Sequence, residues 1–214
     1  KARYSRTGLE GTVTKRGVFS AAGSRIQAGT VAAEVNGLKA SARVRVVPKI
    51  PYAEDFESLA AGGVPPGWIT SKLKAQVTEY EGGKVLRKLA DKPSPPFARL
   101  RCYMMPPIDA GYCVQVDMLG VSNKKRFFPD MGLINSRYLL LLTGSSERTR
   151  KLRLVSWSAV PRIIREIEFP WKGDEWYSVK FSVEIADGTG HVRGKVWPRS
   201  EDEPTAWSLT MEDP

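Results

Sequence analysis

Aromatic and basic side chains on the polar faces of predicted strands offer the clearest ligand-binding chemistry in this sequence. An indole ring stacks on the apolar C–H face of a sugar ring, and a nearby guanidinium orients the sugar hydroxyls through its fork of donors. Five residues fit this chemistry if their strands are neighbours in one sheet: Arg153, Trp157, Trp176, Arg193 and Trp197. The alternative is that loops or another domain cover these rings, with arginine stems packed over them. In the first case the expected ligand is a polysaccharide.

The usual catalytic and redox side chains are sparse. His191 is the only histidine, so a histidine-based triad has one possible base and no visible partner arrangement in the sequence. One histidine and two cysteines do not supply a His/Cys zinc cluster. Cys102 and Cys113 could form a disulfide in a secreted setting. Strand alternation argues against the bond, because Cys102 shares a face with Leu100 whereas Cys113 shares one with Gln115. The disulfide state therefore stays open.

Alternating apolar and polar residues run along most of the chain, and helical periodicity is nearly absent. Residues 31–35 and 38–47 flank Asn36-Gly37 and predict a hairpin with a tight turn. Seven later strands are predicted at residues 112–118, 137–143, 151–157, 162–169, 176–185, 190–197 and 207–211. We therefore predict an all-β sandwich or barrel fold with helix in fewer than roughly a tenth of residues.

Composition excludes several classes. The chain has 214 residues, of which 42% are hydrophobic and 26% charged, as expected for a folded domain rather than a disordered chain. No apolar run is long enough to span a membrane. The chain starts at Lys1 without Met or a signal peptide, which favours a mature or excised fragment.

Charge is concentrated at the N-terminal end. Residues 1–50 contain ten Lys and Arg against Glu10 and Glu34, a net +8, while residues 51–214 carry 23 basic and 21 acidic side chains, a net +2. The basic residues alternate with apolar ones, which is typical of a strand with a solvated face rather than a nucleic-acid-binding arm. The prolines in residues 48–51 mark the predicted boundary between a unit at 1–48 and a domain at 51–214.

The first 48 residues resemble the second half of a bacterial immunoglobulin-like domain. The resemblance rests on Arg-Gly-Val-Phe-Ser-Ala at 16–21, Ala-Gly-Thr-Val at 28–31 and the alternating strand at 40–47. An immunoglobulin-like sandwich needs two sheets, so a half-domain leaves apolar faces and strand edges without partners. We expect another polypeptide, either a cleaved upstream segment or a neighbouring subunit, to complete it. The net +8 suggests that the partner surface is neutral or acidic.

Residues 51–214 resemble a jelly-roll domain of the concanavalin A/laminin G type, as found in large secreted bacterial proteins with a PQQ-binding-like β-propeller upstream. The matching stretches are 52–57, 65–68, 83–86, 130–135 and, most specifically, Val-Arg-Gly-Lys-Val-Trp-Pro at 192–198. The resemblance implies an extracytoplasmic location. It also implies a structural calcium ion where the first and last strands meet, with Glu54, Asp55 and Asp213 as ligands and Glu57 and Glu212 nearby. No other cofactor is expected.

Glu166 and Glu168 are similar to part of the acidic strand of jelly-roll glycoside hydrolases, which carries carboxylates at three alternate positions. Here Ile164 occupies the first position, and Arg162 and Arg165 lie close enough in sequence to pair with the two glutamates. We therefore expect a non-catalytic extracellular binding or structural module, part of a larger secreted protein or assembly, with glycan as one candidate ligand. A glycoside hydrolase, or a related sugar-modifying hydrolase, that uses Glu166 and Glu168 is the alternative.

Overall fold

The structure, a computed structural model, describes residues 1–23, 25–47, 49–89, 99–105, 108, 111–122, 128–144, 149–158 and 160–214. Every regular element in these residues is a β-strand and none is a helix, which confirms the predicted all-β class. Across the same residues, no helix is therefore available to cross a membrane. The chain divides into two compact units, residues 1–106 and 107–214. The predicted boundary at 48–51 lies inside the first unit, and the assignment of 51–214 to a jelly roll stays a prediction.

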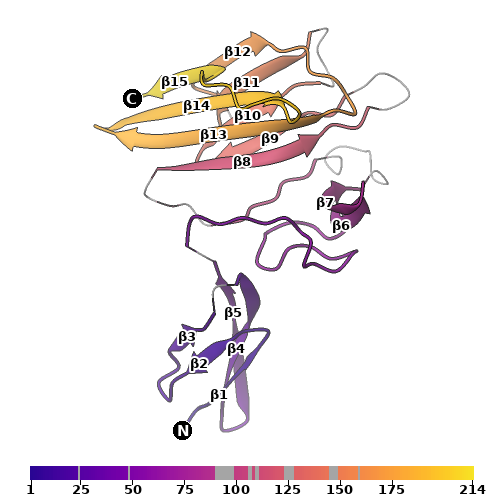
Figure 1. The fold of residues 1–214 in the computed structure, drawn as a ribbon. Helices are drawn as coiled ribbons and strands as arrows, with labels where there is room; N and C mark the ends of the chain where they lie inside the picture. The colour runs from indigo at the N-terminus through magenta and orange to yellow at the C-terminus, as the bar shows by residue number, and fades with distance from the viewer. Residues whose placement is uncertain are drawn as a thin grey trace. The chain divides into compact units, whose positions relative to one another are not determined.

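The second unit contains two four-stranded antiparallel sheets (Figure 1). Sheet I has the order β12-β11-β10-β9 and is built from β9 (Met131–Asn135), β10 (Tyr138–Leu142), β11 (Lys151–Ser156) and β12 (Ile164–Glu168). Sheet II has the order β15-β14-β13-β8 and is built from β8 (Tyr112–Leu119), β13 (Trp176–Ala186), β14 (Thr189–Pro198) and β15 (Leu209–Asp213). All seven strands predicted after residue 111 are present, and β9 is an additional one.

The two sheets pack face to face as a β-sandwich, with β9 against β8 at one side and β12 against β15 at the other. Apart from β12, whose five residues are exposed, the strands direct alternate side chains toward the core, as β13 and β14 show. The core is formed by Leu133, Leu140, Leu142, Leu152 and Leu154 from sheet I, by Tyr177, Val179, Phe181, Val183, Val192, Val196, Leu209 and Met211 from sheet II, and by Trp171. Burying each of these large side chains contributes about 1.5–3 kcal/mol.

At Gly194 the backbone of sheet II lies close to a side chain of sheet I. A Cβ atom at this position would lie 2.6 Å from both Cδ atoms of Leu140, so the branched Leu140 side chain occupies the space that a larger residue on β14 would need. Asn135 adds a polar link in the same core. Its fully buried amide nitrogen donates to the carbonyl oxygens of Tyr112 (3.0 Å) and Phe181 (3.2 Å), so β9 is joined to sheet II without an unsatisfied amide.

The first unit contains one three-stranded sheet and two short hairpins. The N-terminal sheet has the order β1-β4-β5, with β1 (Arg3–Thr7), β4 (Gln27–Val35) and β5 (Leu38–Val46). The hairpins are β2 (Gly11–Val13) with β3 (Phe19–Ala21), and β6 (Ala75–Tyr80) with β7 (Gly83–Lys88). Asn36 and Gly37 both have positive φ, 50° and 80°, which identifies the predicted two-residue turn between β4 and β5 as type I′.

The contact between Gly194 and Leu140 generates a test of the sandwich. We expect Leu140→Ala to lower the free energy of unfolding by about 2–5 kcal/mol through the cavity it leaves. We expect Gly194→Ala to lower it by about 1–3 kcal/mol through overpacking. The methyl group added by Gly194→Ala fits the space that Leu140→Ala vacates. The double variant should therefore be more stable than the sum of the two single losses implies. Additive losses, measured by denaturant unfolding, would show that the two positions do not face each other.

Candidate functional site

The five side chains predicted to form one ligand-binding surface do not share a sheet. Arg153 belongs to β11 and Trp157 follows that strand, so both lie with sheet I. Trp176, Arg193 and Trp197 lie on β13 and β14 of sheet II. The condition for one shared surface, that these strands are neighbours in one sheet, is therefore not met. The reason is physical: alternation fixes the face on which a residue lies, but says nothing about which strands become neighbours.

The two tryptophans of sheet II point away from the sandwich core, as predicted, but differ in accessibility. Trp197 is buried, with 7% of its surface exposed, and Trp176 is half-buried. The Arg199 guanidinium carbon lies 5.3 Å from the centre of the Trp176 ring, and the Lys195 ammonium lies 5.9 Å from that of Trp197. Cation–π contacts within the chain thus occupy ring surface that sugar stacking would need.

A segment between β14 and β15, residues 199–208, covers the outer face of sheet II; we call it the 199–208 strap. Glu203 Oε1 lies 2.8 Å from Lys180 Nζ and 2.7 Å from Lys195 Nζ, and Lys195 also donates to the Pro204 carbonyl oxygen at 2.6 Å. Hydrogen bonds from Lys180 and then Lys195 hold the pKa of Glu203 below its usual value. The Trp207 ring lies 5.0 Å from Lys195 Nζ. Lys195 is consequently only 5% exposed, although it points outward from the sheet.

The strap was not predicted from the sequence. The partner of Lys195 lies eight residues further along the chain, and no periodicity connects the two. The consequence for function is direct: Arg193, whose guanidinium carbon lies 5.6 Å from the Trp207 ring centre, and Trp197 are both packed by their own chain.

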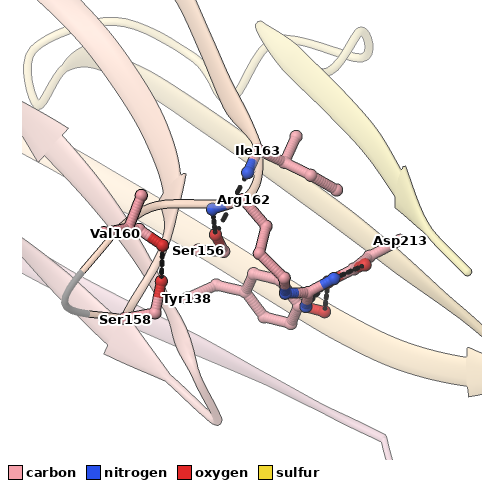
Figure 2. A network of polar contacts seen from close by, with 7 residues as sticks. All are labelled: Tyr138, Ser156, Ser158, Val160, Arg162, Ile163 and Asp213. Carbon is pink, nitrogen blue, oxygen red and sulfur yellow. Dashed lines mark hydrogen bonds and ion pairs between the residues drawn. The ribbon is translucent and has the colours of Figure 1, made fainter.

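Asp213 is the centre of a buried polar network at the end of β15, drawn in Figure 2. Its side chain is 3% exposed and accepts hydrogen bonds from Arg162 Nη1 (2.7 Å), Arg162 Nη2 (2.6 Å) and the Tyr138 hydroxyl (2.6 Å). The backbone amides of Arg162 and Ile163 donate to Ser156 Oγ, which fixes the segment that carries Arg162. The network therefore joins β15 to β10 and to the segment between β11 and β12.

Electrostatics in this network follow from one carboxylate facing a guanidinium and a phenol. Arg162, and then Tyr138, stabilise the ionised carboxylate, so the pKa of Asp213 lies below its usual value. Burial, together with the adjacent carboxylate, raises the pKa of Tyr138 to about 12. An ionised carboxylate, a cation and a neutral phenol together form a structural crosslink.

The predicted calcium ligands are used in other ways. Asp213 is committed to Arg162 and Tyr138, as described above. In the first unit, Glu54 accepts hydrogen bonds from the Tyr52 hydroxyl (3.0 Å) and the Phe56 amide (2.8 Å), and Asp55 accepts one from the Glu57 amide (3.0 Å). In the part of the chain that the structure describes, no three His, Cys, Asp or Glu side chains are grouped so that they could hold a metal ion.

Glu166 and Glu168 lie on β12, the edge strand of sheet I, where all five residues are exposed. Glu166 forms ion pairs with two cations of β11: its Oε1 is 2.5 Å from Lys151 Nζ and its Oε2 is 2.9 Å from Arg153 Nη2. These cations, Lys151 first, lower the pKa of Glu166, so this carboxylate is ionised near neutrality and is poorly suited to donate a proton. The ion partners predicted from the sequence, Arg162 and Arg165, are wrong, since Arg162 binds Asp213.

The two cysteines are free. Cys102 is half-buried, with its sulfur 3.1 Å from Thr70 Oγ1, and Cys113 lies exposed on β8. Burial of the sulfur raises the pKa of both thiols, so neither is activated as a thiolate nucleophile.

The N-terminal sheet has one apolar and one basic face, as its register shows. Cross-strand pairs that share the apolar face are Val35 with Leu38, Ala33 with Ala40, Val31 with Ala42 and Gly29 with Val44. Pairs on the opposite, basic face are Glu34 with Lys39, Ala32 with Ser41, Thr30 with Arg43 and Ala28 with Arg45. β5 forms one edge of this sheet, and its first six residues are all exposed. Leu38 on this face is 74% exposed, so the hairpin end of the sheet presents apolar surface to solvent.

No protein-family model, curated protein or solved structure matches the chain. Functional argument therefore depends on the geometry of these surfaces.

The Asp213 network generates a pH prediction. Because the folded-state pKa of Asp213 is lowered, its stabilisation is present above the unfolded pKa and is lost as the pH falls through the folded pKa. At neutral pH we expect Asp213→Asn to lower the melting temperature by roughly 2–8 °C. As the pH is lowered to about pH 2, the difference between variant and wild type should shrink, because the stabilisation from the ionised Asp213 begins to be lost once the pH falls below the unfolded-state pKa. A difference that stays constant between these pH values would contradict an ionised, paired Asp213.

Proposed function

We propose that this chain is a non-catalytic binding or structural module of a larger extracytoplasmic protein or assembly, and that residues 1–48 bind another polypeptide. The observation that carries the proposal is the uncovered apolar face of the N-terminal sheet beside the open edge of β5. Leu38 is 74% exposed and Val35 is 40% exposed, although both lie on the apolar face. In the sandwich of the second unit, the corresponding inward leucines, such as Leu140 and Leu154, have no exposed surface.

The segment between β1 and β4 covers part of the apolar face. A Cβ atom at Gly29 would lie 2.8 Å from Leu9 Cγ, and one at Gly17 would lie 3.0 Å from the ring of Tyr4, which pairs with Ala33. This segment therefore packs at the Gly29 end of the sheet and also over β1 beside Ala33. At the hairpin end, around Val35 and Leu38, the described residues provide no such cover. A half-covered sheet of this kind is typical of a surface that a partner completes.

The resemblance to a half immunoglobulin-like domain followed by a concanavalin A/laminin G-like jelly roll fits this proposal. An all-β chain with a two-sheet sandwich at residues 107–214 and an incomplete sheet at 1–48 is the arrangement expected for such a piece of a larger secreted protein. The hydrolase alternative draws less support, because Glu166 is ion-paired on an exposed edge strand. Binding of polysaccharide by Trp176 and its neighbours also draws less support, because Arg199 packs over that ring.

Site-specific cross-linking tests the proposal. A photoreactive residue replaces Leu38 in one variant and Ile185 in another, and both are expressed in the cell that makes the protein. Ile185 is the matched control, since it is an apolar strand residue that is 70% exposed in the second unit. We expect irradiation to join one discrete polypeptide to position 38 and none to position 185, read by mass spectrometry. Equal labelling at both positions, or none at position 38, would contradict a polypeptide partner on this face.

A further inference from the structure

We infer that the partner is an extended strand of a different polypeptide, with apolar and acidic side chains in alternation, and that it adds to the open edge of β5. The inference rests on the proposed function and names the chemistry of the partner. Three properties of β5 support it: the direction of its free backbone groups, the charge of its basic face and the small side chains on its apolar face.

The turn fixes which backbone groups of β5 point outward. In a two-residue type I′ hairpin, the residues that flank the turn, Val35 and Leu38, exchange both of their backbone hydrogen bonds. Hydrogen-bonded pairs then recur at every second position, so Ala40, Ala42 and Val44 direct their N–H and C=O groups to β4. The groups that face the open edge are therefore those of Lys39, Ser41, Arg43 and Arg45. These residues are all exposed, and they form a continuous template for an added strand.

Three of the four residues whose backbone groups face the open edge have basic side chains: Lys39, Arg43 and Arg45. Lys39 has a long, exposed contact with Glu34 at 3.9 Å, which is worth little in water. Within the described residues, neither Arg43 nor Arg45 has a carboxylate at ion-pair distance. Because residues directly opposite each other in neighbouring strands share a face, a strand paired with β5 places every second side chain beside Lys39, Arg43 and Arg45. Acidic side chains at these positions neutralise Arg43 and Arg45 and add to the weak contact that Lys39 makes with Glu34.

The same charges argue against a second copy of this chain as the occupant. Antiparallel pairing of two β5 edges about Ala42 would set Lys39 opposite Arg45, and parallel pairing would bring the same cations together in a row. Like charges directly opposite each other destabilise a strand pair. Basic side chains on an edge strand are a known protection against self-association. The β5 edge thus disfavours pairing with a second copy of this chain and favours pairing with an acidic strand.

The apolar face of β5 indicates which side chains should alternate with the acidic ones in the added strand. Between the exposed Leu38 and the half-buried Val44, β5 carries only Ala40 and Ala42 on this face. Two alanines leave room beside them for larger apolar side chains. An added strand with valine, isoleucine or leucine at every second position would cover Leu38 and extend the apolar face by one strand.

Peptide binding to the full-length chain tests this inference. The probe is a nine-residue fluorescent peptide in which Val alternates with Glu, and the control replaces each Glu by Lys. By fluorescence anisotropy we expect the acidic peptide to bind about tenfold more tightly than the basic one, since three opposite-charge pairs add. The preference should weaken as salt is added.

Two variants separate strand addition from general charge attraction. Ser41→Pro removes the outward N–H at the middle of the edge without removing a bond to β4, and Ser41→Ala is its matched control. We expect Ser41→Pro to abolish binding of the acidic peptide and Ser41→Ala to keep it. The double variant Arg43→Glu, Arg45→Glu should favour the basic peptide instead. The β-sheet circular dichroism of each variant shows whether the chain is folded.

Three results would overturn the inference: no binding of the acidic peptide, equal binding of both peptides, or acidic-peptide binding that persists in folded Ser41→Pro. A cross-link at position 38 alongside any of these would retain the polypeptide partner and reject only the acidic strand. Absence of the cross-link would reject the proposed function itself.

Discussion

A β-sheet with one apolar face is stable in water only when that face is covered and its edges are paired or guarded. The second unit meets this requirement internally. Sheets I and II cover each other, Gly194 lets Leu140 enter between them, and the inward side chains of both sheets form one core. The first unit meets the requirement only in part, because β5 and the hairpin end of its sheet remain open. This difference between the units is the basis for assigning function to residues 1–48.

Two buried charged groups of the sandwich, Asp213 and Lys195, have partners within the second unit. Asp213 is buried beneath the exposed Arg162 and beside Tyr138, and Lys195 is buried beneath the exposed Glu203 and beside the Pro204 carbonyl. In both networks the charged group is buried only where a partner lies within hydrogen-bond distance. The titratable clusters of the second unit therefore crosslink strands and loops, and their charges are already neutralised within the chain. Within the described residues, Arg43 and Arg45 of β5 have no ion-pair partner and Lys39 has only a long, exposed one, so the charge of this face is available to another molecule.

Alternation was sufficient to predict the fold class, most strands of the second unit and the core faces of β13 and β14. It could also have indicated the Asp213 network, because Leu209, Met211 and Asp213 share the inward face of β15 and a buried carboxylate needs a cation. It could not place Trp157 in a different sheet from Trp176, because strand order depends on long-range packing. Nor could it show that the 199–208 strap buries Lys195 and Trp197, since a loop has no periodicity.

Amide hydrogen exchange along β5 in the isolated, monomeric chain tests the open edge most directly. If β5 is paired on one side only, the amides of Ala40, Ala42 and Val44 exchange slowly, because they bond to β4. Those of Lys39, Ser41, Arg43 and Arg45 then exchange at rates close to those of an unstructured peptide. The predicted result is this alternation at every second residue. Strong protection of Lys39, Ser41, Arg43 and Arg45 in the monomer would contradict it, because it would mean that the chain already covers its own edge.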